Sequence, residues 1–128
     1  MKRSLVLFAE DHQDTRELFS LILSQEGFEV EKTADGGEAH EALEHARPDV
    51  LLVDLMMPGI DGVELIRRVR GMPEPADVPI VATSAFSGPH LESAARSGAT
   101  VVMRKPFEPR VIADVVRLAL GREDIPHV

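Results

Sequence analysis

The 128-residue sequence predicts a single α/β domain in which five parallel strands form one open sheet with helices on both faces. Two observations predict this class. Five short apolar runs alternate along the chain with five stretches in which apolar residues recur at helical spacing. The first, third and fourth runs contain almost no polar residues, which is typical of parallel strands that are covered on both sides. Right-handed crossovers would then distribute the helices over the two faces.

The expected strands are separated by intervals that are long enough for one helix each. The second strand alternates apolar and polar residues, which indicates an edge of the sheet. The strands are expected at SLVLFA (4–9), FEVEKT (28–33), DVLLVDL (49–55), PIVATSA (79–85) and TVVMRK (100–105).

Each expected helix has an apolar stripe, and most have a stop signal. Gly27, Pro48, Gly98 and Gly121 would end four of the helices, and Pro109 would lie in the first turn of the last one. The stripes are Leu18, Leu21, Ile22 and Gln25; Ala39, Ala42, Leu43 and Ala46; Val63, Ile66 and Val69; Leu91, Ala94 and Ala95; and Val111, Ile112, Val115, Leu118 and Ala119.

Composition excludes several classes of function. Cysteine is absent, which rules out disulfides, thiolate catalysis, zinc fingers and iron–sulfur clusters. The net charge of −8, with no run of Lys or Arg, argues against direct binding of nucleic acid or of anionic membranes. No apolar run approaches the roughly 20 residues of a membrane-spanning helix, and the first residues do not form a signal peptide. We therefore expect a cytoplasmic protein.

Polar residues that suit a phosphoryl site follow four of the five expected strands. Ligands of open parallel sheets bind at the carboxyl ends of the strands. Ionised carboxylates gathered there would raise one another's pKa values unless a cation lay among them. Mg²⁺ binds one or two carboxylates together with phosphate oxygens, and a carboxylate can itself form an aspartyl phosphate. The residues concerned are Glu10 and Asp11, Asp54, Thr83 and Ser84, and Arg104 and Lys105.

Four motifs in this order resemble the receiver domains of two-component response regulators, the CheY-like family. They are the acidic pair Glu10-Asp11, VDLMMPGIDG (53–62), PIVATSA (79–85) and KPF (105–107). The resemblance covers residues 4–120, so residues 1–121 would form a receiver domain and residues 122–128 a short tail. It implies a flavodoxin-like strand order of 2-1-3-4-5, in which the first and third strands are neighbours.

The resemblance implies that Asp54 accepts a phosphoryl group from the phosphohistidine of a sensor histidine kinase or phosphotransfer protein. Mg²⁺ would be bound by Asp11, by Asp54, by Glu10 through water, and by the backbone carbonyl of Met56. The family has Asp more often than Glu at the position of Glu10, and the longer side chain keeps the same chemistry. The chain would catalyse only its own phosphorylation and dephosphorylation, so it is not an enzyme with an external substrate.

The resemblance also implies the parts that sense the phosphoryl group. Lys105 would pair with its oxygens, and a cis peptide would precede Pro106. Ser84 matches the family's switch hydroxyl. Because side chains alternate along a strand, only one of Thr83 and Ser84 can face the site, and Thr83 is the alternative if Ser84 does not. Val102 stands where the family often has Tyr or Phe, so the usual aromatic relay to the face of the fourth helix, fifth strand and fifth helix cannot form.

Other functions remain open at this point. A receiver-like interaction module that does not switch is the main alternative, because of Val102. A small aspartyl-phosphate phosphatase is disfavoured, since Met56 stands where haloacid-dehalogenase-like enzymes have a second Asp. A flavodoxin-type nucleotide binder is disfavoured because residues 10–14 would repel phosphate. The downstream effector protein is not specified by the sequence, and the chain is expected to be a monomer or a weak homodimer.

Overall fold

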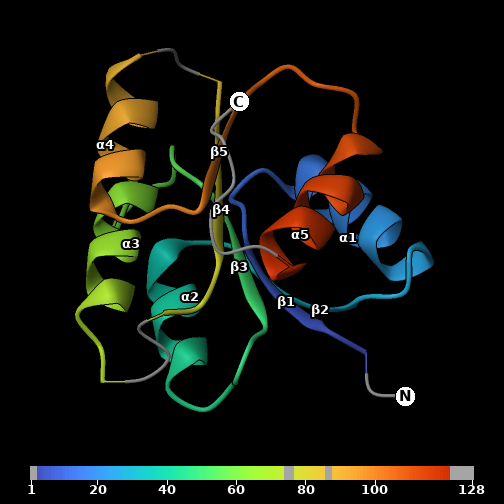
Figure 1. The fold of residues 1–128 in the computed structure, drawn as a ribbon, viewed down its shortest axis with the longest axis horizontal. Coiled ribbons are helices and arrows are strands. Elements are labelled where there is room, and N and C mark those ends of the chain that lie inside the picture. Colours follow the sequence, from blue (N-terminus) through green and yellow to red (C-terminus); the bar gives the residue numbers. More distant parts are fainter. Residues whose placement is uncertain (1–2, 74–76, 86–87, 122–128) are drawn as a thin grey trace.

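The computed structural model describes residues 3–73, 77–85 and 88–121, and within them five strands alternate with five helices (Figure 1). The expected tail at residues 122–128 lies outside the described residues. The elements are β1 (Leu5–Ala9), α1 (Gln13–Gln25), β2 (Glu29–Thr33), α2 (Gly36–Leu43), β3 (Val50–Asp54), α3 (Gly62–Arg70), β4 (Ile80–Ser84), α4 (Pro89–Ser97), β5 (Val101–Arg104) and α5 (Val111–Gly121).

The strands form one parallel sheet in the order β2-β1-β3-β4-β5. This order confirms the predicted doubly wound fold and places the alternating strand β2 at an edge. The register pairs Ala9 with Val53 and Asp54 with Thr83. The carboxyl ends of β1, β3 and β4 therefore lie side by side.

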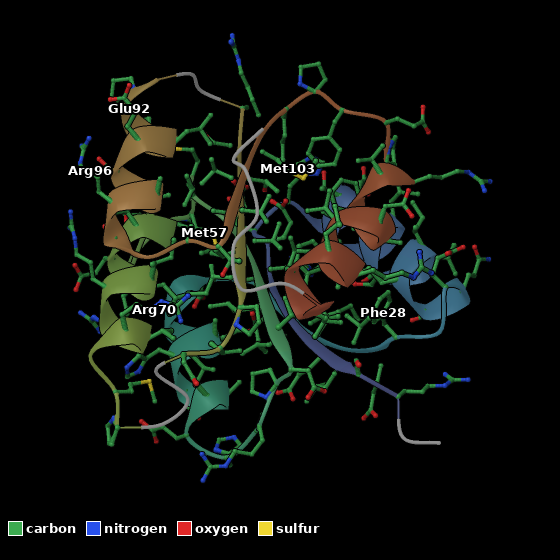
Figure 2. All side chains as sticks on the ribbon, viewed as in Figure 1. Phe28, Met57, Arg70, Glu92, Arg96 and Met103 are labelled. Carbon is green, nitrogen blue, oxygen red and sulfur yellow. The ribbon has the colours of Figure 1, made fainter. Side chains whose placement is uncertain are left out.

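The two faces of the sheet carry separate hydrophobic cores. Figure 1 shows α2, α3 and α4 on one side of the sheet and α1 and α5 on the other. Met57 lies in the first core and Phe28 in the second, on opposite sides of the sheet in Figure 2. Successive residues of β1 and β3 alternate between the two cores, and all are fully or almost fully buried except Leu5. This is the physical reason for their almost continuous apolar sequence.

The predicted stripe of α1 is wrong at Leu18, Leu21 and Gln25, whereas Ile22 packs against the core as predicted. Leu18 and Leu21 are 45% and 56% exposed, whereas Phe19 and Leu23 are buried. Both sets fit helical spacing, and they differ by a small rotation about the helix axis. The larger side chain decides between them, because the ring of Phe19 stacks against that of Phe8 with centroids 6.1 Å apart.

Local hydrogen bonds set the ends of α2. The Asp35 carboxylate accepts from the Glu38 N–H at 2.8 Å, and the Glu38 carboxylate accepts from the Ala34 N–H at 3.1 Å. Asp35 is therefore the N-cap, and the pair resembles a capping box in which the glutamate reaches the N–H of the residue before the N-cap. The helix ends at Leu43, earlier than the stripe predicted, so Ala46 lies beyond its end.

The fifth helix also differs in detail from the prediction. It begins at Val111, so Pro109 lies in the turn before the helix and not in its first turn. Gly121 is its last residue and does not follow it. Leu118 was expected in the buried stripe but is 47% exposed. Among the described residues, no helix has the length and apolar character needed to cross a membrane.

Candidate functional site

Three carboxylates converge at the carboxyl edge of the sheet. Each of Glu10, Asp11 and Asp54 offers an oxygen within 4.8 Å of the others. Glu10 and Asp11 follow β1 and Asp54 ends β3, and the sequence placed them together because these strands were expected to be neighbours. Glu10 and Asp54 are buried, whereas Asp11 is exposed. The cluster therefore has a buried floor and one carboxylate at its rim.

Lys105 supplies the positive charge of the cluster. Its Nζ lies 3.2 Å from Oε1 of Glu10 and 3.7 Å from Oδ2 of Asp54. The residue follows β5 directly, so the ammonium reaches the cluster across β4 from the far edge of the sheet. The peptide bond between Lys105 and Pro106 is cis, as the resemblance implied.

One lysine does not balance three carboxylates. The pKa of Glu10 is raised from its ordinary 4.5 to about 7, mainly by burial and in addition by the hydrogen bond to Asp54 and the negative charge of Asp54. The charge of Lys105 and the N–H of His12, which donates to Oε2 of Glu10 at 3.2 Å, oppose this rise. The site therefore holds more negative charge than its own residues neutralise, and additional cationic charge would stabilise it.

The turn after β3 holds Asp54 in place. Its Oδ1 accepts from the Met56 N–H at 3.1 Å. From the sequence, Gly59 and Gly62 are both expected to permit positive φ in the turn around Pro58. Gly59 has a φ of +75°, which confirms the prediction, whereas Gly62 does not have a positive φ, so that prediction is wrong. Its role is close approach, because a Cβ there would lie 2.5 Å from the Leu55 Cα.

Two hydroxyl residues end β4, and both are buried. Thr83 pairs with Asp54 in the register and lies on the same face as Val81, which packs in the α1–α5 core. Ser84 lies on the opposite face with Ala82, at the point where the loop begins. Both hydroxyls are close to the edge that carries Asp54, so the switch role of Ser84, with Thr83 in reserve, stays a prediction.

Sequence reasoning missed Arg16, which supports the acidic pair. Nη1 of Arg16 donates to the main-chain oxygens of Glu10 at 2.8 Å and of Asp11 at 3.3 Å. His12 is the N-cap of α1, and its Nδ1 accepts from the Thr15 N–H at 3.3 Å. A basic residue in the early turns of a helix that follows an acidic pair is the signal that would have identified Arg16.

Fold and site together define a doubly wound domain with an acidic, lysine-bearing cluster at its carboxyl edge. A family model described as the response regulator receiver domain matches residues 6–117. The chain belongs to this family, the CheY-like receiver domains of two-component systems, which confirms the resemblance.

Curated proteins with similar sequences are also response regulators. The chain is 37% identical to the transcriptional regulatory protein CseB of Streptomyces avermitilis over 118 residues, which are 91% of this chain and 49% of that protein. It is 33% identical to the DNA-binding response regulator MtrA of Mycobacterium tuberculosis, over 95% of this chain and 53% of that protein. The chain thus spans about half the length of these curated relatives.

Solved structures agree in fold. The chemotaxis response regulator CheY4 of Vibrio cholerae superposes with a TM-score of 0.84 at 31% identity, covering 91% of this chain and 98% of that one. The receiver domain of a signal transduction histidine kinase from Syntrophus aciditrophicus superposes with a TM-score of 0.85 at 29% identity, covering 92% and 90%. Receiver domains of this kind act as phosphoacceptors in two-component signalling, and the chain has the corresponding acidic site.

Proposed function

We propose that Asp54 accepts a phosphoryl group from the phosphohistidine of a sensor histidine kinase or phosphotransfer protein, and that this modification switches the chain between inactive and active states. The observation that carries the proposal is the position of the Asp54 carboxylate. It ends a buried strand beside two further carboxylates, and Lys105 Nζ is 3.7 Å away. A buried carboxylate with a fixed lysine neighbour suits a nucleophile whose product is an anion.

The transfer is a displacement at phosphorus. A carboxylate oxygen of Asp54 forms a bond to phosphorus while the phosphorus–nitrogen bond of phosphohistidine breaks, and the imidazole nitrogen keeps the electron pair. Lys105 pairs with the oxygens of the transferred group. Water later cleaves the aspartyl phosphate and regenerates the carboxylate and inorganic phosphate. Neither step transforms an external substrate beyond the donor.

The residues of the cluster fit Mg²⁺. They offer hard carboxylate oxygens, and the raised pKa of Glu10 reflects excess negative charge that a divalent cation would offset. We infer that Asp11 and Asp54 bind the ion directly, Glu10 through water, and Met56 through its backbone carbonyl. When bound, Mg²⁺ supplies the charge neutralisation that lets an anionic phosphoryl group approach three carboxylates.

Phosphorylation would be reported through the surface of α4, β5 and α5 to an effector protein. Ser84, or Thr83 in its place, would hydrogen-bond the phosphoryl group and shift the population of the loops after β3 and β4. One observation favours the alternative of a non-switching interaction module: Val102 is buried in the core on the α4 side and carries no ring to report the change.

The test is incubation with acetyl phosphate and Mg²⁺, read by intact mass. We expect one phosphoryl adduct, which is lost on adding chelator and in Asp54→Asn. The control is Asp14→Asn, an exposed acid in the first turn of α1, which should be phosphorylated normally. An adduct that persists in Asp54→Asn would show that another residue is the acceptor. Phosphorylation without any change in the amide spectrum of β5 would support the non-switching alternative.

A further inference from the structure

The net charge of the chain is confined to one part of the fold. Residues 11–45 hold ten acidic and two basic residues, whereas the remainder holds twelve of each, so the whole charge of −8 belongs to α1, β2, α2 and the loops that join them. Eight of the ten acids are exposed, and Glu31 and Asp35 are half-buried. Only Asp11 of this set belongs to the phosphoryl site, so the phosphoryl site does not account for the others.

β2, the strand within this acidic part, has an open edge. It pairs with β1, and no other described strand covers its outer side. The main-chain N–H of Glu29 donates to the main-chain oxygen of Ser4, and the main-chain oxygen of Thr33 accepts from the N–H of Glu10. The odd-numbered residues of β2 therefore form their main-chain hydrogen bonds with the β1 side. In a parallel ladder the intervening residues, Val30 and Lys32, then direct their main-chain N–H and C=O groups outward.

A hollow lies on each side of this edge. On the α2 side, a hollow of about 240 Å³ is lined by Glu31, Lys32, Thr33, Glu38, Glu41, Ala42 and His45. The ammonium of Lys32 pairs with Glu17 at 3.1 Å, so the three carboxylates of this hollow are left in excess. On the α1 side, a hollow of about 230 Å³ is lined by Glu17, Ser20, Leu21, Ser24, Val30 and Lys32. The side chains of an added strand would point alternately into these two hollows, because successive residues of a strand face opposite ways.

Ser20, which lines the α1-side hollow, carries an unsatisfied hydroxyl that is buried beneath the surface of the hollow. Ser20 is 6% exposed, and its hydroxyl has no hydrogen-bond partner in the described part of the chain. Its neighbours in the hollow include the apolar Leu21 and Val30. A ligand side chain with both a methyl group and a hydroxyl would match this lining, whereas three carboxylates on the other side would match a cation.

We propose that the outer edge of β2 binds an extended basic segment of a partner protein as an added strand, with Arg or Lys facing α2 and small hydroxyl or apolar residues facing α1. Main-chain bonds to Val30 and Lys32 supply affinity, and the hollows supply specificity. Charge decides against a second copy of this chain, because two such edges would bring like charges together. The acids also protect the edge from self-association, which is consistent with a reserved binding role.

The experiment uses the whole chain and a fluorescent peptide of about ten residues that alternates arginine and threonine. We expect saturable binding that weakens with salt. Glu31→Gln with Glu41→Gln should weaken binding about tenfold. The matched control is Glu92→Gln with Glu108→Gln, two exposed acids outside residues 11–45; Glu92 lies on α4 (Figure 2) and should change affinity less than about twofold.

Two further measurements separate strand addition from simple charge attraction. The amides of Val30 and Lys32 should exchange about tenfold more slowly in the complex, while that of Glu31, which already bonds to β1, should change little. Ser20→Ala should weaken the arginine–threonine peptide about threefold and leave an arginine–valine peptide unaffected. The proposal would be overturned if a peptide with all its arginines followed by all its threonines bound equally well. It would also be overturned if the amides of Val30 and Lys32 exchanged no more slowly in the complex, or if the chain dimerised through β2.

Discussion

Glu10 should make the metal-free protein less stable as the pH rises. The perturbation is removal of divalent ions by a chelator, which leaves the carboxylate cluster with Lys105 as its cation. Burial and the neighbouring Asp54 raise the pKa of Glu10 to about 7 in the folded chain, against 4.5 for an ordinary glutamate. Between these two values the folded chain holds one proton more than the unfolded chain. The free energy of unfolding therefore falls as pH rises through this window.

The size of the effect follows from the same two values. A difference between 4.5 and about 7 corresponds to about 3 kcal/mol at 1.36 kcal/mol per pKa unit. This contribution is fully present below 4.5 and is lost as pH passes about 7. The steepest change should be about 1.4 kcal/mol for each pH unit near the middle of the window.

The assay is urea unfolding in chelator at intervals from about pH 5 to about pH 8, followed by circular dichroism. Glu10→Gln keeps the size of the side chain and cannot titrate, so its curve should lack this fall. Glu44→Gln, an exposed glutamate on the acidic part of the chain, should retain it. Parallel curves for the wild type and Glu10→Gln would refute the reasoning, because they would mean that the folded chain holds no extra proton on Glu10.

Three further results are expected. Asp11→Ala should weaken Mg²⁺ binding in calorimetry by about tenfold or more, since even outer-shell partners of a metal are worth that much; unchanged affinity would contradict the metal assignment. Arg70→Met should lower the free energy of unfolding by about 2 kcal/mol, because the Arg70 guanidinium donates to the main-chain oxygens of Val78, before β4, and of Gly98, after α4. The control Arg67→Met, at an exposed position, should change the free energy of unfolding by less than about 0.5 kcal/mol. Gly62→Ala should destabilise the chain and slow phosphorylation, because the new Cβ would meet main-chain atoms at the end of β3. Gly71→Ala is the control, because a Cβ there makes only ordinary contacts. Equal stability of the two variants would contradict this prediction.

The strand order and the acidic cluster could be predicted because both depend on features that lie within short stretches of sequence. Short runs that are apolar on both faces, such as residues 50–53, are typical of covered parallel strands. Once such strands are neighbours, polar residues at their carboxyl ends must meet, which is why Glu10, Asp54 and Lys105 were predicted together and lie together.

Other features depend on contacts between distant segments, and the sequence does not encode them locally. The face of α1 was mispredicted because the Leu18 and Phe19 stripes both fit a helix, and the choice rests on the fit of Phe19 against Phe8 in another strand. Gly62 reads like any turn glycine until the backbone it approaches is known.

A main-chain contact between β4 and β5 suggests how phosphorylation could affect the rest of the domain although Val102 replaces the usual aromatic residue. Val102 is buried in the core on the α4 side and pairs with Ala82 in the sheet, so it cannot turn between two positions as a ring at the surface would. The main chain offers a shorter route, because the Lys105 N–H donates to the Ser84 oxygen at 2.7 Å. Both residues that we assign to the phosphoryl oxygens are thereby joined where β4 and β5 end. We propose that a phosphoryl group on Asp54 would draw the two side chains together and so change the relative free energies of the positions of these strand ends, which would bias the α4–β5–α5 face.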